Sequence, residues 1–216
     1  MDPIDLDAFG RTPLVRDPFD HIVVPAFVPS AAASNARAGF PDIRCGGLIP
    51  VSRSGYGEGF ARLIDALGSD AVREAFQAKF GVALDPRSLL MTLRGRCRHY
   101  DGQIHTDSDS KLVTALIYLD EDWHADGGRL RLLRGPDDIE DMIAEVPPGP
   151  GTLVAFRRSE NSFHGHKPYE GVRRVVMLNW MVDAKAADRE RRRHALSARV
   201  KQLVSSGNDA GAGRMS

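Results

Sequence analysis

The pattern of apolar and polar positions divides the chain into a helical first part and a strand-rich second part. Apolar side chains recur at helical spacing over residues 60–67 and again over residues 72–80. Ser69 is a favourable N-cap for the second of these helices, and Gly81 is a favourable C-terminal stop. An alanine-rich helix is also predicted over residues 30–38. We expect these helices to support the rest of the chain.

The first 25 residues predict little regular structure. Residues 1–20 are rich in Asp and Pro and show no hydrophobic period, which predicts an extended arm. The apolar run over residues 21–25 predicts a short strand that ends at Pro25.

After Pro86 the pattern changes to short runs of branched and aliphatic residues separated by Gly, Pro and Asp. Runs of this kind are typical of strands. They cover residues 89–93, 112–119, 129–133, 152–156 and 174–182. Short strands joined by turns favour an antiparallel sandwich or barrel.

The same pattern predicts how the chain is organised. We expect a single domain over residues 1–183, in which residues 1–86 form a helical support and residues 87–183 a β core. Residues 184–216 should form a basic helical tail with a frayed end. We expect the charged face of this tail to lie in water rather than on nucleic acid.

Composition excludes several classes of protein. With 216 residues, of which 42% are hydrophobic, the chain is long enough to bury a core. The 29 basic and 29 acidic side chains cancel, which argues against a general nucleic-acid or membrane-surface binder. Two cysteines cannot build a disulfide framework. The amino terminus is acidic and no apolar run approaches the ~20 residues that span a bilayer, so we expect a cytoplasmic protein.

A candidate metal-binding pair lies just ahead of the second predicted strand. His105 and Asp107 are separated by one residue, and alternate side chains of an extended segment project to the same side. An imidazole and a carboxylate held side by side can bind one metal ion. Because a His-x-Asp pair also occurs by chance in surface loops, a third ligand from another segment is needed.

The candidate for this third ligand is His164, which lies between the fourth and fifth predicted strands. Two histidines and one carboxylate form the facial triad that is typical of non-haem Fe(II) enzymes. The same residues could hold zinc as a catalytic ion with a bound water. Two neighbours of the same residue types, Asp109 and His166, are alternative ligands.

Two arginines, Arg173 and Arg174, open the last predicted strand. A guanidinium on a strand of apolar residues needs an anionic partner, and a dicarboxylate that chelates the metal at one end would supply one at its other end. Alternation along the strand groups Arg174 with Val176, Leu178 and Trp180, and puts Arg173 on the opposite face. We expect one arginine to be buried and the other to reach solvent.

These residues lie in two segments with a family resemblance. Residues 105–133, which begin HTDSDSKLVTALIYLDEDWH, and residues 149–183, which include FHGHKPYEGVRRVVMLNW, resemble the catalytic core of the Fe(II)- and 2-oxoglutarate-dependent oxygenases. They look most like the prolyl hydroxylase branch, which includes the hypoxia-factor prolyl hydroxylases and their bacterial relatives. The resemblance covers residues 89–183. It implies a mainly β fold with flanking helices (α+β), in which N-terminal helices pack on a double-stranded β-helix, or jelly roll.

The resemblance also implies roles for individual residues. His105, Asp107 and His164 match the iron ligands of the family. Arg174 matches the basic residue that binds the far carboxylate of 2-oxoglutarate, and Arg173 is the runner-up because this chain has one extra residue after the distal histidine. Three further positions match residues of the cosubstrate pocket or share its face, and they are Tyr118, Tyr100 and Thr114.

The implied chemistry is hydroxylation of an organic substrate coupled to decarboxylation of 2-oxoglutarate to succinate. It requires Fe(II) and O2, with ascorbate as a candidate reductant. A prolyl residue of a protein is the substrate that the branch suggests, and a free amino acid or another small metabolite is the alternative. A catalytically retired jelly-roll binding module should have lost at least one site residue, and a zinc hydrolase has no reason to carry Arg174 together with Tyr118.

Overall fold

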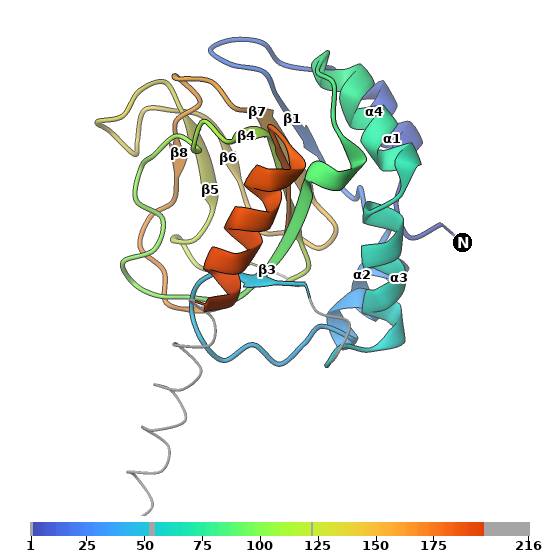
Figure 1. The fold of residues 1–216 in the computed structure, drawn as a ribbon. Helices are drawn as coiled ribbons and strands as arrows, with labels where there is room; N and C mark the ends of the chain where they lie inside the picture. Colours follow the sequence, from blue (N-terminus) through green and yellow to red (C-terminus); the bar gives the residue numbers. More distant parts are fainter. Residues whose placement is uncertain (1, 52–54, 122, 197–216) are drawn as a thin grey trace, which may run out of the picture.

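Two antiparallel sheets face each other, and helices cover the outer face of the larger sheet (Figure 1). The computed structural model describes residues 2–51, 55–121 and 123–196. The helices are α1 (Leu6–Arg11), α2 (Ser30–Ala38), α3 (Glu58–Leu67), α4 (Asp70–Phe80) and the 3-10 turn η1 (Pro86–Ser88). The strands are β1 (His21–Val24), β2 (Ile49–Pro50), β3 (Leu89–Cys97), β4 (Lys111–Tyr118), β5 (Leu130–Leu133), β6 (Met142–Val146), β7 (Leu153–Arg157), β8 (His164–Gly165) and β9 (Gly171–Met181).

The six-stranded sheet has the order β1-β7-β4-β9-β3-β2, and the three-stranded sheet has the order β6-β5-β8. Neighbouring named strands in both sheets are antiparallel. β4 and β9 lie at the centre of the larger sheet, so side chains of both strands face a buried layer on each side. This arrangement confirms the predicted jelly-roll core with flanking helices.

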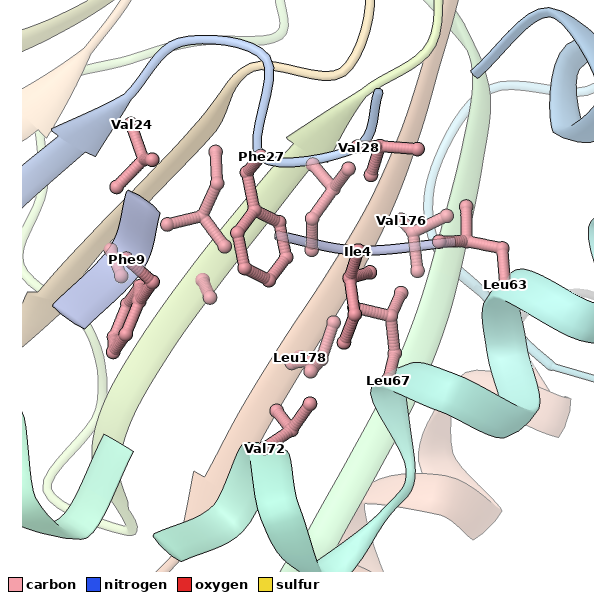
Figure 2. Packing of buried hydrophobic residues seen from close by; sticks show 14 of the residues in the cluster. Ile4, Phe9, Val24, Phe27, Val28, Leu63, Leu67, Val72, Val176 and Leu178 are labelled. Carbon is pink, nitrogen blue, oxygen red and sulfur yellow. The ribbon is translucent and has the colours of Figure 1, made fainter. Parts of the chain in front are cut away.

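The outer face of the larger sheet packs against the N-terminal helices. Val176, Leu178 and Trp180 of β9 are buried in one apolar cluster with side chains of α3 and α4. Figure 2 shows side chains of this cluster, in which the α3 residues Leu63 and Leu67 approach the β9 residues from the helical side. Trp180 also packs against Phe76 of α4, with the two rings tilted and their centroids 4.6 Å apart. The side chains of Val176, Leu178 and Trp180 therefore pack against the helices.

The inner face of the larger sheet packs against the smaller sheet. Tyr118 of β4, Phe156 of β7 and Val175 of β9 share a second apolar cluster with Leu130 and Leu132 of β5. Residues that pair directly across an antiparallel ladder project to the same face, so the register extends this inner face across the sheet. It contains alternate residues of four strands: Thr92 and Arg94 of β3; Thr114, Leu116 and Tyr118 of β4; Val154 and Phe156 of β7; and Arg173, Val175, Met177 and Asn179 of β9.

Local signals set the ends of α4 as the sequence predicted. The hydroxyl of Ser69 accepts a hydrogen bond from the backbone N–H of Val72 at 3.4 Å. Gly81 ends the helix at φ 62°, a left-handed conformation that glycine adopts without strain. The alanine-rich helix also has the predicted bounds, 30–38.

The prediction of an extended arm over residues 1–20 is wrong, because residues 6–11 form α1. Asp5 caps this helix by accepting the backbone N–H of Ala8 at 2.7 Å. Phe9 on the helix stacks on Phe76 of α4 at 4.6 Å between ring centroids. This contact with a residue distant in the sequence stabilises a helix too short to show a hydrophobic period.

Residues 184–196 are helical, as predicted for the first part of the tail, and appear in orange-red in Figure 1. Ala186 and Ala187 are buried against Leu90 of β3 and Met181 of β9. The remaining tail, residues 197–216, lies outside the described residues. Within the part of the chain that is described, no helix is both long and apolar enough to span a membrane.

Candidate active site

Three side chains predicted as metal ligands come together at one end of the space between the sheets. The potential ligand atoms of His105, Asp107 and His164 all lie within 4.8 Å of one another. Asp107 and His164 are buried, whereas His105 is exposed. The site is therefore bounded by protein on two sides and reaches solvent on the side of His105.

The backbone fixes the two histidines relative to each other. His105 and His164 form an isolated antiparallel bridge, in which each backbone N–H donates to the other carbonyl at 3.0 Å. Their rings lie 4.4 Å apart between centroids, and Phe156 packs 4.6 Å from His164 on the inner face of the sheet. The two imidazoles are thus set in place by main-chain hydrogen bonds and packing.

Hydrogen bonds to the backbone also set the protonation of both rings. The Nδ1 atom of His105 lies 2.8 Å from the carbonyl oxygen of Gln103, and Nδ1 of His164 lies 3.0 Å from that of Ser162. A carbonyl can only accept, so Nδ1 carries the proton in each ring and Nε2 keeps its lone pair for a metal. Burial lowers the pKa of His164 to about 4, despite the nearby charge of Asp107, so this ring is neutral at pH 7.

Asp107 is held as a carboxylate. Its Oδ1 atom lies 2.6 Å from the ammonium of Lys111, and its Oδ2 atom accepts the hydroxyl proton of Thr114 at 2.5 Å. Burial acts to raise the pKa of Asp107, but the charge of Lys111 and these two hydrogen bonds outweigh it and leave the pKa below its ordinary value. Thr114, which we expected to line the cosubstrate pocket, instead directly supports this carboxylate.

A buried arginine lies further along the same inner face. Arg173 is 3% exposed, and its Nε atom donates to the carbonyl of Gly128 at 2.8 Å. Its Nη2 atom donates to the hydroxyl of Tyr118 at 3.3 Å, and its guanidinium lies 5.3 Å from the centroid of that ring. Both hydrogen-bond partners are neutral, and no carboxylate among the described residues forms an ion pair with Arg173. The charge of Asp120 is felt by Arg173, but no described carboxylate contacts the guanidinium, and a buried charge without a hydrogen-bonded partner is costly, which makes this position suited to an anionic ligand.

The prediction that Arg174 shares the site with Tyr118 is wrong in its geometry. Arg174 lies on the other face of β9, where its Nη1 atom pairs with Oδ1 of Asp120 at 3.0 Å and its backbone N–H donates to Oδ2 at 2.7 Å. Val176, Leu178 and Trp180 of β9 face the helices, and Arg174 alternates in step with them. Arg173 is therefore the arginine that points between the sheets, where it contacts Tyr118. The geometry therefore favours the runner-up, Arg173.

Tyr118 is fully buried, and its hydroxyl is protonated at pH 7. Burial raises the pKa of Tyr118, although the charge of Arg173 opposes this. Because the oxygen of Tyr118 accepts a hydrogen bond from Arg173, its own proton stays available for a ligand. Tyr100, the second expected pocket tyrosine, is 63% exposed, and its hydroxyl accepts from Arg98 at 2.6 Å. The turn at the end of β3, closed by Asp101 N–H to the Arg98 carbonyl, directs Tyr100 away from the site.

The two alternative ligands, Asp109 and His166, do not belong to the group formed by His105, Asp107 and His164. Asp109 forms an ion pair with Arg158, and its side chain is 87% exposed. His166 is buried but lies outside the three-residue group, with Nδ1 2.8 Å from the carbonyl of Lys167.

Three further residues, Lys111, Asn179 and Arg94, face the site and were not predicted. Asn179 alternates with Arg173 along β9, and Arg94 alternates with Thr92 along β3, so these two positions can be assigned to the inner face once the direction of one residue in each strand is known.

The donor set at this site fits Fe(II). Two imidazole nitrogens and one carboxylate, all reachable by a single ion, are the ligands of the facial triad that leaves coordination positions open for substrates. Each of these residues also has the supporting hydrogen bonds that orient metal ligands: the two histidines donate to backbone carbonyls, and Asp107 accepts from Thr114 and Lys111.

Comparison with known proteins agrees with this chemistry. Residues 92–182 match the model of the 2OG-Fe(II) oxygenase superfamily, and this range contains the three clustered residues as well as Arg173 and Tyr118. No curated protein sequence gives a significant match.

Several solved structures share the fold. A prolyl-4-hydroxylase from Pseudomonas putida superposes with a TM-score of 0.56 at 20% identity, over 82% of this chain and 90% of that one. A prolyl hydroxylase from Trichoplax adhaerens, in complex with a hypoxia-inducible factor peptide fragment, gives 0.52 at 15% identity, over 85% and 91%. HygX from Streptomyces hygroscopicus, with nickel and 2-oxoglutarate bound, gives 0.51 at 15% identity, over 74% and 81%. At these identities the likeness concerns the fold.

Proposed function

We propose that the chain is an oxygenase that uses Fe(II) and 2-oxoglutarate and hydroxylates an organic substrate at the His105, Asp107 and His164 site, because residues 92–182 match the 2OG-Fe(II) oxygenase superfamily model. The observation that carries this proposal is the convergence of the potential ligand atoms of His105, Asp107 and His164 within 4.8 Å of one another, together with the buried guanidinium of Arg173, which contacts no carboxylate among the described residues. A metal ion at one end of the space between the sheets and the guanidinium of Arg173 further along it would bind the two ends of a dicarboxylate such as 2-oxoglutarate.

In this proposal each residue has a defined task. The Nε2 atoms of His105 and His164 and one carboxylate oxygen of Asp107 hold the iron, while Thr114 and Lys111 keep Asp107 ionised and oriented. When bound, Fe(II) supplies the redox chemistry by which O2 oxidises 2-oxoglutarate to succinate and carbon dioxide and adds a hydroxyl group to the substrate.

Arg173 and Tyr118 orient the cosubstrate. The guanidinium of Arg173 pairs with the far carboxylate, and the phenol of Tyr118 donates its remaining proton to the same group. The apolar side chains between them and the metal, Leu116, Leu132 and Val154, exclude water from the chain of carbons that joins the two ends.

A prolyl residue of a polypeptide is one of two candidate substrate classes. Supporting it is the fold shared with prolyl hydroxylases, one of which holds a peptide fragment. A free amino acid or a small metabolite is the competing class. Succinate release measured with proline-containing peptides and, separately, with free amino acids distinguishes the two.

Metal and cosubstrate binding test the proposal directly. Anaerobic addition of Fe(II) and 2-oxoglutarate to the protein should produce a weak visible charge-transfer band. His105→Ala and Asp107→Ala should each abolish this band, whereas His124→Ala, a change at an exposed histidine, should leave it intact. A wild-type protein that gives no band and binds neither component would disprove the assignment.

A further inference from the structure

A second arginine, Arg94 of β3, also faces the space between the sheets, and neither metal nor cosubstrate requires it. In the ladders of the larger sheet Arg94 pairs with Val175, and Tyr118 pairs with the same residue from the other side. Arg94, Val175 and Tyr118 therefore form one row across the inner face. Within this row, Arg94 on β3 lies on the side of β9 that is away from β4 and β7.

Arg94 is held by a single carboxylate. Its Nη1 atom lies 2.6 Å from Oδ2 of Asp101 and 3.7 Å from the sulfur of Cys97. The side chains of Arg94 and Asp101 are each 18% exposed. The Nε and Nη2 atoms of Arg94 donate to no described residue. Among the described residues, the buried side-chain atoms that lack a hydrogen-bond partner are in Thr92 and Trp180, so these two atoms of Arg94 are not buried. These donors consequently face space that water or a ligand can enter.

Arg94 and Arg173 lie near the same buried phenol. The Nη2 atom of Arg173 donates to the hydroxyl of Tyr118 at 3.3 Å. Burial raises the pKa of Tyr118, and the charges of Arg173 and Arg94 both act to lower it. Two guanidinium groups therefore lie at this end of the space, with Asp101 paired to Arg94 and the charge of Arg173 felt by Asp120.

We propose that Arg94 binds a carboxylate of the substrate, so that the enzyme acts on a small organic acid such as a free amino acid. This inference rests on the proposed function, in which the metal and the Arg173–Tyr118 pair take the two ends of 2-oxoglutarate. Arg94 lies on β3, two strands across the sheet from Tyr118 on β4, and its unused donors remain for another anion. A free acid provides that anion, whereas an interior residue of a polypeptide has lost its carboxylate to the peptide bond.

Asp101 gives this proposal a sharp contrast with a purely structural role. If Arg94 only anchors the turn of Asp101 and Gly102, then breaking the pair from either side should have the same consequence. If Arg94 binds a carboxylate, Asp101 competes with that ligand for the guanidinium. Removing Arg94 should then weaken ligand binding, while neutralising Asp101 should strengthen it.

The experiment uses the full chain loaded with Co(II) and N-oxalylglycine, an unreactive analogue of 2-oxoglutarate. The twenty free amino acids and their carboxamides are titrated by calorimetry, and succinate release from the Fe(II) enzyme is measured on the same panel. We expect at least one free acid to bind, and its amide to bind more weakly by about tenfold or more.

Three variants complete the test. Arg94→Met should weaken binding of that acid by about ten- to hundredfold and leave N-oxalylglycine binding unchanged. Asp101→Asn should tighten binding of the acid. Arg96→Met, which removes an exposed arginine from the same strand, should have no effect and serves as the matched control. Arg94→Lys keeps the charge and should retain part of the affinity if Arg94→Met does not fold.

Several outcomes would overturn the proposal. Equal losses in Arg94→Met and Asp101→Asn would mean that the pair is structural. A loss of N-oxalylglycine binding in Arg94→Met would assign Arg94 to the cosubstrate instead. A wild-type protein that binds Co(II) and N-oxalylglycine but no free acid would refute the substrate carboxylate and leave the oxygenase assignment standing. A protein that binds neither would refute both.

Discussion

The choice between two adjacent arginines gives the most direct test of the site. Replacing Arg173 by methionine keeps the volume of the side chain but removes the only cation that contacts Tyr118 among the described residues. Because Arg173 is 3% exposed, the carboxylate of 2-oxoglutarate would lose its partner in a place that water reaches poorly. Removing one member of a buried, hydrogen-bonded charge pair costs about 2–5 kcal/mol, which corresponds to a loss of affinity of about thirtyfold to several thousandfold.

Arg174→Met is the matched control, because it changes the neighbouring residue in the same way. Arg174 pairs with Asp120, and its side chain is 34% exposed, so 2-oxoglutarate affinity should change by less than about threefold. Both affinities are measured by calorimetric titration of 2-oxoglutarate into Co(II)-loaded protein, with thermal melting as the check on folding. If Arg174→Met lost the ligand while Arg173→Met kept it, the assignment of faces on β9 would be refuted.

Four further substitutions test the support of the site and of the fold. Thr114→Val removes the hydroxyl that orients Asp107 and should weaken Co(II) binding by about tenfold in a calorimetric titration, and an unchanged affinity would contradict its positioning role. Phe76→Ala empties the centre of the helical layer and should lower the free energy of unfolding by about 3–5 kcal/mol in urea, whereas a loss below about 1 kcal/mol would show that the helices contribute little. Two glycines with free space around them should respond with opposite signs: Gly81→Ala, at φ 62°, should cost about 1 kcal/mol, and Gly10→Ala within α1 should stabilise by up to about 1 kcal/mol. Equal signs in the same urea assay would contradict the backbone argument.

Features encoded in a few adjacent residues could be predicted from the sequence. The cap at Ser69 and the stop at Gly81 define α4 without reference to the rest of the molecule. His105 and Asp107 could be paired because one intervening residue in an extended segment decides their direction. β6 (Met142–Val146) escaped prediction because it is only partly buried and lacks a clear alternation of apolar residues, and β8 consists of only two residues.

Features that depend on partners across the fold could not be predicted in this way. Alternation on β9 separates Arg173 from Arg174, but it does not say which face meets the helices and which meets the smaller sheet. That information lies in the packing of Trp180 on Phe76 and of Val175 in the second cluster. The same reason applies to Arg94, whose relation to Tyr118 exists only through the register that both share with Val175.

The paired backbone hydrogen bonds between His105 and His164 have a consequence for how the protein handles its metal. Two of the three proposed ligands are spaced by main-chain hydrogen bonds, so the fold itself sets the distance between their rings and does not need an ion to do so. Folding and metal loading are then separate events, unlike in small zinc domains that unfold when the ion is removed. Chelation should strip the ion and leave a folded scaffold that can be reloaded with a different metal. Which ion the enzyme carries would therefore depend on the supply of metals in its surroundings as well as on its own ligands.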